Sequence, residues 1–281
     1  MNKFLRTKRF FTILILAVSL PTLIFAQKQT EKFSTEENIK ADLQLNVCEN
    51  KERLEAVKKL FKKMGATDDE IKIEKFKDVE NLVVTKRGKS DEIVVIGAHY
   101  DKTSDGCGAI DNWTGIVIIA NLYKTFKNFA TEKTYLFVAF GQEETGLVGS
   151  SQMAKAIPKE ERGKYCSMIN FDSFGFNYPQ ILDNASDSKM TKAAKELGRQ
   201  AKISVESASL AGAADADSTS FLDKDIPAIT FHGLSNNWRE YLHGSKDKLE
   251  NVNAQSVYVG YQFGLSFLAQ VDQSGCGVFR K

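Results

Sequence analysis

The sequence predicts an α/β fold in which a mostly parallel mixed sheet is flanked by helices on both faces. Short, nearly continuous apolar runs alternate with helical patterns, the order expected when helices join parallel strands. The runs lack the polar alternation of a half-exposed strand, so we expect both faces of the sheet to be covered. The 281 residues, 42% hydrophobic and 26% charged, suffice for one domain with a full core.

The first half of the chain is predicted to contain a helix and a β-hairpin. Residues 52–65 repeat apolar side chains at helical spacing and stop at Gly65. The apolar runs 82–85 and 93–98 flank a glycine-containing turn, which is typical of a hairpin. The charge-rich stretch 58–78 is interpreted as an exposed face.

Beyond the hairpin, helices and strands alternate toward the C-terminus. The expected helices cover residues 114–129, 149–156, 188–201 and 256–271. The expected strands cover residues 134–140, 167–173, 179–184 and 226–231. In an open sheet of this kind, ligands bind beyond the carboxyl ends of the strands. The residues that follow each strand are therefore candidates for a functional site.

Residues 1–26 have the pattern of a secretory signal peptide. Four cations in the first ten residues precede an uncharged apolar stretch that ends at Ala26. The alternative is a retained membrane anchor. The apolar stretch is short and Pro21 interrupts it, which favours cleavage. Against cleavage, Ile24 stands three residues before the expected cleavage site, where signal peptides usually have a small residue. We expect a periplasmic or secreted protein with no stable membrane insertion after cleavage.

The remaining chain divides into a polar N-terminal segment, residues 27–45, and a single domain, residues 46–281. The whole chain has 38 Lys and Arg against 36 Asp and Glu, and removal of the signal peptide would take away four of those cations and no acid. A balance this close to neutral lacks the basic surface of nucleic-acid-binding proteins. We therefore expect that the protein does not bind nucleic acid. We also expect it to be a monomer.

All four cysteines, Cys48, Cys107, Cys166 and Cys276, lie beyond the signal peptide. In an oxidising compartment an even number permits disulfides, and four cysteines allow three pairings, among which the sequence does not choose. No CxxC spacing is present, so a zinc site made of cysteines is disfavoured.

Imidazoles and carboxylates collect after the predicted strands. They are His99, Asp101, Asp111, Glu143, Glu144, Asp172 and, before the last helix, His243. Histidine combined with Asp and Glu suits zinc, and the set exceeds what one tetrahedral ion needs, which favours two ions. A strand returns residue i+2 to the same face, so Asp101 is expected to accept from the second ring nitrogen of His99.

Each candidate also has a structural interpretation. Asp111 could cap the helix that follows it, the adjacent Glu143 and Glu144 could be solvated, and a lone histidine is more often structural. Asp172 is harder to explain in this way, because it ends a core strand and a buried carboxylate needs a partner or a cation. His232 ends a strand with no acid nearby, so we interpret it as a core or rim histidine.

Five motifs in order resemble the secreted di-zinc aminopeptidase family, which includes bacterial leucyl aminopeptidases and also the glutaminyl cyclases. They are HYD (99–101), GAIDNWTG (108–115), EETG (143–146), NFDSFG (170–175) and YLHGSKD (241–247). The match covers roughly residues 91–271. Each motif alone is weak, but the five in this order are specific.

The resemblance implies a ligand set for two Zn²⁺ ions per chain. His99 would bind one ion and His243 the other, and Asp111 would bridge them, with a cis peptide bond to Asn112. Asp172 would complete the shell on the His99 side, and Glu144 the shell on the His243 side.

The resemblance also implies catalytic and supporting roles. Glu143 would be the general base, Asp101 would orient His99, and Asp247 would orient His243. From its place just before His243, Tyr241 is a candidate donor to the substrate. Two positions depart from the family pattern: Ile110 stands where many members have a second Asp, and Ser218 replaces a His near the substrate pocket.

The resulting hypothesis is an exported zinc-dependent aminopeptidase that acts on peptides. One alternative is a glutaminyl cyclase-type acyltransferase on the same scaffold, and another is a non-catalytic binding homologue. The retained DNxxG and EExG motifs favour hydrolysis over cyclisation, and the presence of all five ligand positions disfavours a non-catalytic protein.

Overall fold

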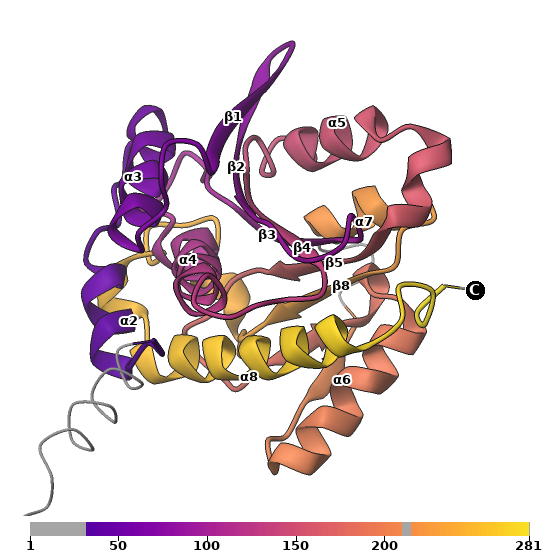
Figure 1. The fold of residues 1–281 in the computed structure, drawn as a ribbon. Coiled ribbons are helices and arrows are strands. Elements are labelled where there is room, and N and C mark those ends of the chain that lie inside the picture. Colours follow the sequence, from indigo (N-terminus) through magenta and orange to yellow (C-terminus); the bar gives the residue numbers. More distant parts are fainter. Residues whose placement is uncertain (1–31, 210–214, 281) are drawn as a thin grey trace, which may run out of the picture. The chain divides into compact units, whose positions relative to one another are not determined.

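The computed structural model describes residues 32–209 and 215–280, in which eight strands form one mixed sheet in the order β1-β2-β4-β3-β5-β8-β6-β7 (Figure 1). The strands are β1 (Ile71–Phe76), β2 (Val79–Lys86), β3 (Ile93–His99), β4 (Thr134–Phe140), β5 (Tyr165–Phe171), β6 (Gln180–Leu182), β7 (Glu206–Ala208) and β8 (Ala228–His232). The central strands β4, β3, β5 and β8 are parallel, while β2 and β6 join them antiparallel.

Helices cover both faces of this sheet. One face carries α2 (Glu36–Leu43), α3 (Asn50–Lys63), α4 (Thr114–Phe126), α6 (Ser188–Ala201) and α8 (Ala254–Gln273). The other carries α5 (Val148–Ala156) and α7 (Asp217–Leu222). Along β3, Val94 and Ile96 enter the larger core and Val95 the smaller, because successive side chains of a strand point to opposite faces. The predicted α/β fold is confirmed.

The hairpin predicted from residues 82–85 and 93–98 is wrong. β2 pairs with β1 and with β4, so β4 separates β2 from β3. The hairpin partner of β2 is instead β1, which lies within the charged stretch 58–78. Charged side chains are common on edge strands because they discourage pairing with other chains. In β1 the charged side chains are the reason why the sequence alone indicates an exposed face and not a strand.

The polar segment 27–45 contains a helix that the sequence analysis does not predict. α2 begins with a capping box, in which the Thr35 hydroxyl accepts the N–H of Asn38 and the Asn38 side chain accepts the N–H of Thr35. Ile39 and Leu43 of α2 are buried in the core. The compact unit therefore begins at Ser34 and not at residue 46. The signal peptide predicted over residues 1–26 lies outside the described residues.

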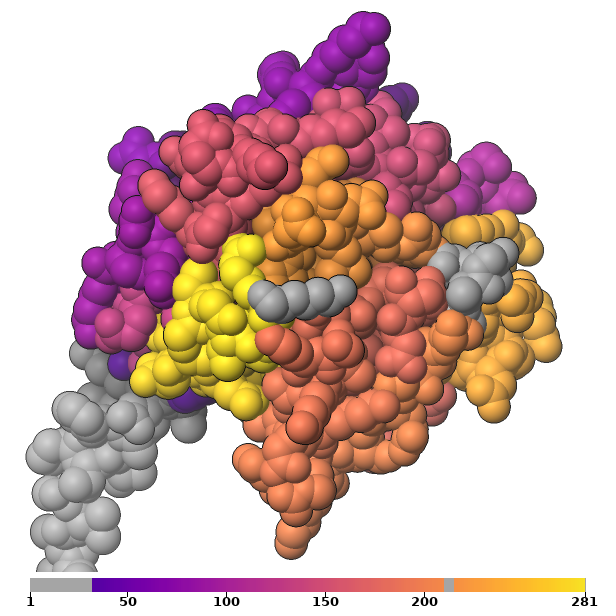
Figure 2. All heavy atoms as spheres, turned by 90° about the vertical axis from the view of Figure 1, so that its right-hand side faces the viewer, coloured from indigo at the N-terminus to yellow at the C-terminus, as the bar shows by residue number. Residues whose placement is uncertain are grey.

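Two disulfides select one of the three possible pairings. Cys48 pairs with Cys107, and Cys166 pairs with Cys276. The first bond joins the segment before α3 to the loop that precedes Asp111. The second joins the start of β5 to the C-terminal segment, which Figure 2 shows in yellow beside the residues that precede β5. None of the described helices is long and apolar enough to cross a membrane.

Candidate metal centre

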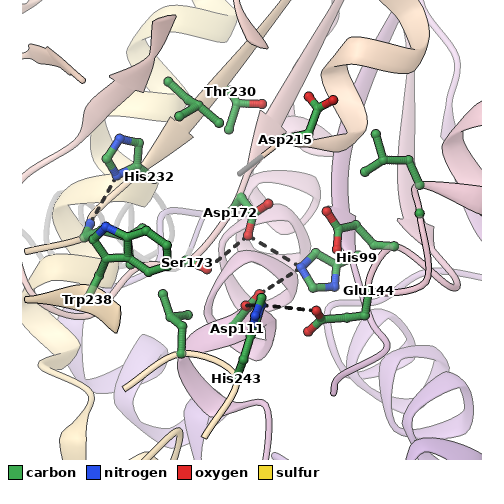
Figure 3. A pocket seen from close by; sticks show the side chains of 16 residues that line it. His99, Asp111, Glu144, Asp172, Ser173, Asp215, Thr230, His232, Trp238 and His243 are labelled. Carbon is green, nitrogen blue, oxygen red and sulfur yellow. Dashed lines mark hydrogen bonds and ion pairs between the residues drawn. The ribbon is translucent and has the colours of Figure 1, made fainter. Parts of the chain in front are cut away.

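The carboxyl ends of three parallel strands bring the candidate residues to one edge of the sheet (Figure 3). His99 is the last residue of β3, Asp172 follows β5, and Glu143 and Glu144 follow β4. Because β3 lies between β4 and β5, the three strand ends are direct neighbours. Asp111 reaches the same edge from η1 (Ala109–Trp113), a short π-helical turn directly before α4 in which Asp111 and Asn112 have non-helical backbone angles. Open α/β sheets bind ligands at this edge.

Asp111 lies at the middle of the cluster and divides its carboxylate between two imidazoles. Its Oδ1 is 3.0 Å from Nε2 of His99, and its Oδ2 is 3.2 Å from Nε2 of His243. A second carboxylate accompanies each imidazole. Oδ1 of Asp172 is 3.5 Å from His99 Nε2, and Oε2 of Glu144 is 3.3 Å from His243 Nε2. The five predicted ligands thus form two groups that share Asp111, and Asp111 does not point away into a helix cap.

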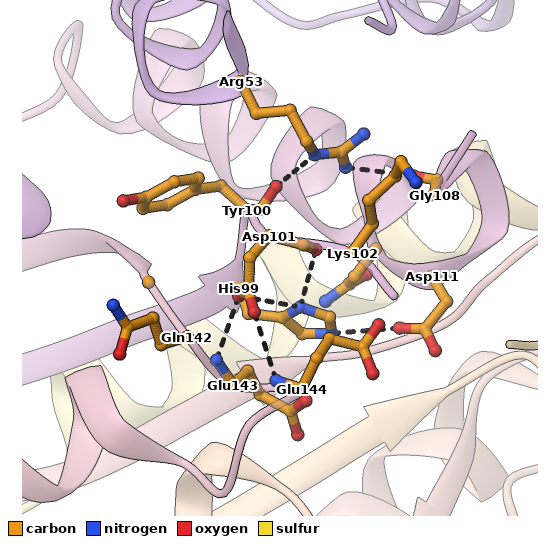
Figure 4. Close-up of polar contacts among 12 residues, drawn as sticks. Arg53, His99, Tyr100, Asp101, Lys102, Gly108, Asp111, Gln142, Glu143 and Glu144 are labelled. Carbon is orange, nitrogen blue, oxygen red and sulfur yellow. Dashed lines mark hydrogen bonds and ion pairs between the residues drawn. The ribbon is translucent and has the colours of Figure 1, made fainter. Parts of the chain in front are cut away.

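Asp101 connects the ends of β3 and β4. Its Oδ1 lies 3.6 Å from Nδ1 of His99, and its two carboxylate oxygens accept the N–H groups of Glu143 and Glu144 at 3.0 and 3.2 Å (Figure 4). The main-chain oxygen of Asp101 is also 3.2 Å from His99 Nδ1. These contacts make Asp101 a positioning residue, because they hold the His99 ring through Nδ1 and the two glutamates through their main-chain N–H groups.

Asn112 ties the Asp111 loop to the end of β5. Its Oδ1 accepts the N–H groups of Gly115 and Ser173, and its Nδ2 donates to the carbonyl of Phe171. The peptide bond between Asp111 and Asn112 is cis, as the family resemblance implies. Asn112 therefore fixes the distance between Asp111 and the strand end that carries the other carboxylate of the His99 group.

Two supporting residues are placed differently from the sequence expectation. The carboxylate of Asp247 accepts the N–H of Ile110 at 2.7 Å, so it holds the Asp111 loop in place of the predicted contact with His243. Tyr241 packs its ring against Phe176, with centroids 4.9 Å apart, and is not among the residues that line the pocket beside the centre. The role of Tyr241 as a donor to the substrate stays a prediction.

The crowded carboxylates of the centre have strongly shifted pKa values. Burial, reinforced by the charge of Asp111, raises the pKa of Glu144 to about 8, and burial raises the pKa of Glu143 well above its usual range. Burial also opposes ionisation of Asp111, but its contacts with His243 and His99 hold its pKa below the usual range. The contact with Asp111 raises the pKa of His243 to about 9.

The raised pKa values of Glu143, Glu144 and His243 favour their protonated forms in the metal-free centre. A bound divalent cation would displace these protons. Oε1 of Glu144 is buried and has no hydrogen-bond partner among the described residues, which leaves one carboxylate oxygen for another ligand. Candidate donor atoms of His99, Asp111 and Glu144 lie within 4.8 Å of one another, as do those of His99, Glu143 and Asp172. Imidazole and carboxylate donors at this spacing fit zinc.

A pocket of about 340 Å³ opens beside the centre. Its apolar wall consists of Leu147, Leu182, Leu234, Trp238 and Leu242, and Asp215, Thr230 and His232 add polar groups (Figure 3). The sequence analysis does not predict the apolar residues, because they come from separate loops and form no local motif. The one sequence feature that could have indicated two of them is that Trp238 and Leu242 lie a few residues before the predicted ligand His243.

His232, predicted to be a core or rim histidine, is buried at the end of β8 and contributes to the pocket wall. Burial lowers its pKa to about 4, so the ring is neutral near pH 7. Its Nδ1 accepts the N–H of Leu234. Ser218, at the position where the family resemblance implies a histidine, is buried and contacts Thr230 Oγ1 at 2.6 Å and the Ala185 carbonyl at 2.7 Å.

The fold and the centre together define the class, an α/β protein with a paired imidazole–carboxylate site at the strand ends. The chain belongs to peptidase family M28, whose model matches residues 81–259. Aminopeptidase YwaD of Bacillus subtilis is 26% identical over 193 residues, which are 63% of this chain and 41% of that protein. Aminopeptidase Y of Saccharomyces cerevisiae is 31% identical over 124 residues, 43% of this chain and 23% of that protein. The chain thus spans less than half the length of these two relatives.

Solved structures share the fold at low sequence identity. The LapA aminopeptidase of Legionella pneumophila has a TM-score of 0.72 at 19% identity, covering 96% of this chain and 78% of that one. BSAP, a zinc aminopeptidase from Bacillus subtilis, has a TM-score of 0.62 at 19% identity, covering 72% and 53%. A glutaminyl cyclase from an Acidobacteriales bacterium has a TM-score of 0.73 at 15% identity, covering 85% and 94%.

Proposed function

We propose that this chain is a zinc-dependent aminopeptidase that releases N-terminal residues from peptides. The observation that carries the proposal is the division of the Asp111 carboxylate between His99 and His243, each with a further carboxylate beside it. Each imidazole with its carboxylates could hold one Zn²⁺ ion, so we propose two ions per chain. The family match and the zinc aminopeptidase among the similar structures support the choice of metal and reaction.

When bound, zinc would act as a Lewis acid and lower the pKa of a coordinated water. The chain's own residues would do the rest. Glu143 lies with His99 and Asp172 in one cluster, and it would take a proton from the attacking water and return it to the leaving amine. Asp101 holds the main chain of Glu143, so it would fix the direction of this proton transfer. The two adjacent glutamates thus have separate roles, proton carrier and ligand.

The pocket suggests the class of N-terminal residue. Its wall of leucines and Trp238 would accept an apolar side chain. Near pH 7 the neutral imidazole of His232 adds no charge to this wall. Asp215 also lines the pocket, but its carboxylate oxygen Oδ1 already accepts the N–H of Ala216. We therefore propose peptides with apolar N-terminal residues as substrates.

The second candidate is a glutaminyl cyclase-type acyltransferase, favoured by the fold similarity to a cyclase. The paired ligand groups disfavour it, because a cyclase of this family is expected to use one catalytic zinc. A non-catalytic homologue is disfavoured by the assembly of all five candidate ligands around Asp111.

We also propose that the protein works as a monomer in the periplasm or outside the cell, without stable membrane insertion after signal cleavage. Two disulfides in one chain support this location, since disulfides persist in oxidising compartments.

Purified protein tested for metal content and activity would decide among these functions. We expect two zinc ions per chain and hydrolysis of leucyl-p-nitroanilide that a chelator abolishes and added zinc restores. One zinc per chain with cyclisation of N-terminal glutamine would identify a cyclase. Full zinc occupancy without turnover of aminoacyl-nitroanilides, unmodified peptides or glutaminyl substrates would identify a binding protein.

A further inference from the structure

The segment between the two proposed ligands His99 and Asp111 has little regular structure of its own. Residues 100–108 form neither helix nor strand, although they connect the end of β3 to the Asp111 loop. A segment of this kind takes its position from contacts with the rest of the molecule. The separation of the two ligands therefore depends on what holds residues 100–108.

Arg53 of α3, which is fully buried, contacts both ends of this segment, and the main-chain oxygen of Asp247 accepts the N–H of Cys107 at 2.7 Å. Nε of Arg53 donates to the carbonyl of Tyr100, Nη1 donates to the carbonyl of Cys107 at 3.0 Å, and Nη2 donates to that of Gly108 at 3.0 Å (Figure 4). One rigid guanidinium thus donates hydrogen bonds to both ends of the segment 100–108. Lysine, with a single nitrogen, could not reach the two ends at once.

Neighbours of Arg53 hold the same segment. Cys48 is bonded to Cys107, and Asn46 donates to the Cys107 carbonyl at 3.1 Å. Asn50 and the main chain of Lys102 exchange two hydrogen bonds, at 2.8 and 3.0 Å. We call Asn46, Cys48, Asn50 and Arg53 the loop clamp.

The charge of Arg53 matches the acidic centre that it supports. Asp247, Asp101, Asp111 and Glu144 all favour its charged form, and although burial lowers its pKa to about 10, it remains a cation at neutral pH. A buried guanidinium is costly unless it is hydrogen-bonded, and Arg53 meets this condition through its bonds to the carbonyls of residues 100–108.

We propose that the loop clamp positions His99 relative to Asp111 and thereby sets the zinc affinity of the centre, with Arg53 as a positioning residue. The clamp lies before the family match, which begins at residue 81. This inference rests on the proposed function, because it requires that the centre binds zinc.

Zinc affinity of Arg53→Lys, measured on the full chain by competition with a chelating indicator, tests the proposal. We expect affinity to fall roughly 10–100-fold, the usual effect of removing a group that orients metal ligands. The absorption spectrum of the Co²⁺-loaded variant should change as well, because it reports ligand geometry. The matched control is Arg280→Lys: Arg280 also donates to three carbonyls, of Asp225, Arg162 and Tyr165, but near the start of β5.

A second pair of variants keeps the test independent of one substitution. Replacing Cys48 and Cys107 by serine should weaken zinc binding, whereas replacing Cys166 and Cys276 should lower thermal stability and leave zinc affinity unchanged. If the clamp variants bind zinc as tightly as the parent chain, or if the control variants lose equal affinity, the inference is overturned. If the parent chain binds no zinc, the proposed function itself fails.

Discussion

The two halves of the candidate centre are built differently. The His99 side chain is 1% exposed and ends a central strand, with Asp101 behind its ring. The His243 side chain is 58% exposed and lies on a loop between β8 and α8, with a left-handed backbone at φ 57°. Both imidazoles contact Asp111, yet one is fixed by the sheet and the other by a surface loop.

This difference indicates a division of labour between the two positions. A ligand whose orientation is set by packing and hydrogen bonds loses little freedom when a metal binds, so the His99 side should bind zinc more tightly. The His243 side, next to Leu242 and Trp238 of the pocket wall, can adjust when a substrate enters. We expect zinc on that side to exchange faster.

The largest effect is expected from Glu143→Gln. The substitution keeps the size of the side chain and removes the proton acceptor, so turnover should fall about 10²–10⁴-fold while zinc content is unchanged. Steady-state rates combined with metal analysis would measure this. Near-native turnover would show that Glu143 is not the base.

The next effect separates the two halves directly. His99→Asn should reduce zinc content to less than one ion per chain after dialysis, because it damages the better organised position. His243→Asn should retain one tightly bound ion. Metal analysis of both proteins after the same dialysis makes the comparison. Equal losses in the two variants would contradict the proposed difference in affinity.

Zinc binding on the His243 side should depend on pH. Glu144 and His243, with pKa values of about 8 and 9 in the metal-free protein, must lose protons before they bind zinc. Both pKa values are raised, so lowering the pH fills these ligands with protons. Affinity on the His243 side should rise as the pH is increased from about 6 to about 9. A pH-independent affinity in titration calorimetry would contradict this assignment.

The smallest effect is expected in the pocket wall. Trp238→Ala should raise KM for a leucyl substrate roughly tenfold with a smaller change in kcat, because the pocket wall loses apolar contact area but the ligands stay in place. Leu45→Ala is a matched control, since Leu45 is exposed and lies outside this pocket. A change in kcat alone would place Trp238 in the chemistry and not in substrate binding.

The sequence alone determined the fold class and the residues that meet at the sheet edge. Parallel strands with continuous apolar runs place their carboxyl ends at one edge of the sheet, so the sequence alone groups His99, Glu144 and Asp172. The residue types then favoured metal binding over the structural interpretations. These signals are local, a strand followed by its polar residue, and local signals can be read from a sequence.

Tertiary structure decided what depends on contacts distant in sequence. It paired β2 with β1 and β4, chose the disulfide partners, and brought Trp238 into the pocket wall. It also placed Arg53, which in the sequence is one cation of a charged helix, inside the protein against three carbonyls of residues 100–108. Such contacts depend on how separate elements pack, and no spacing along the chain encodes which carbonyl a buried guanidinium will meet.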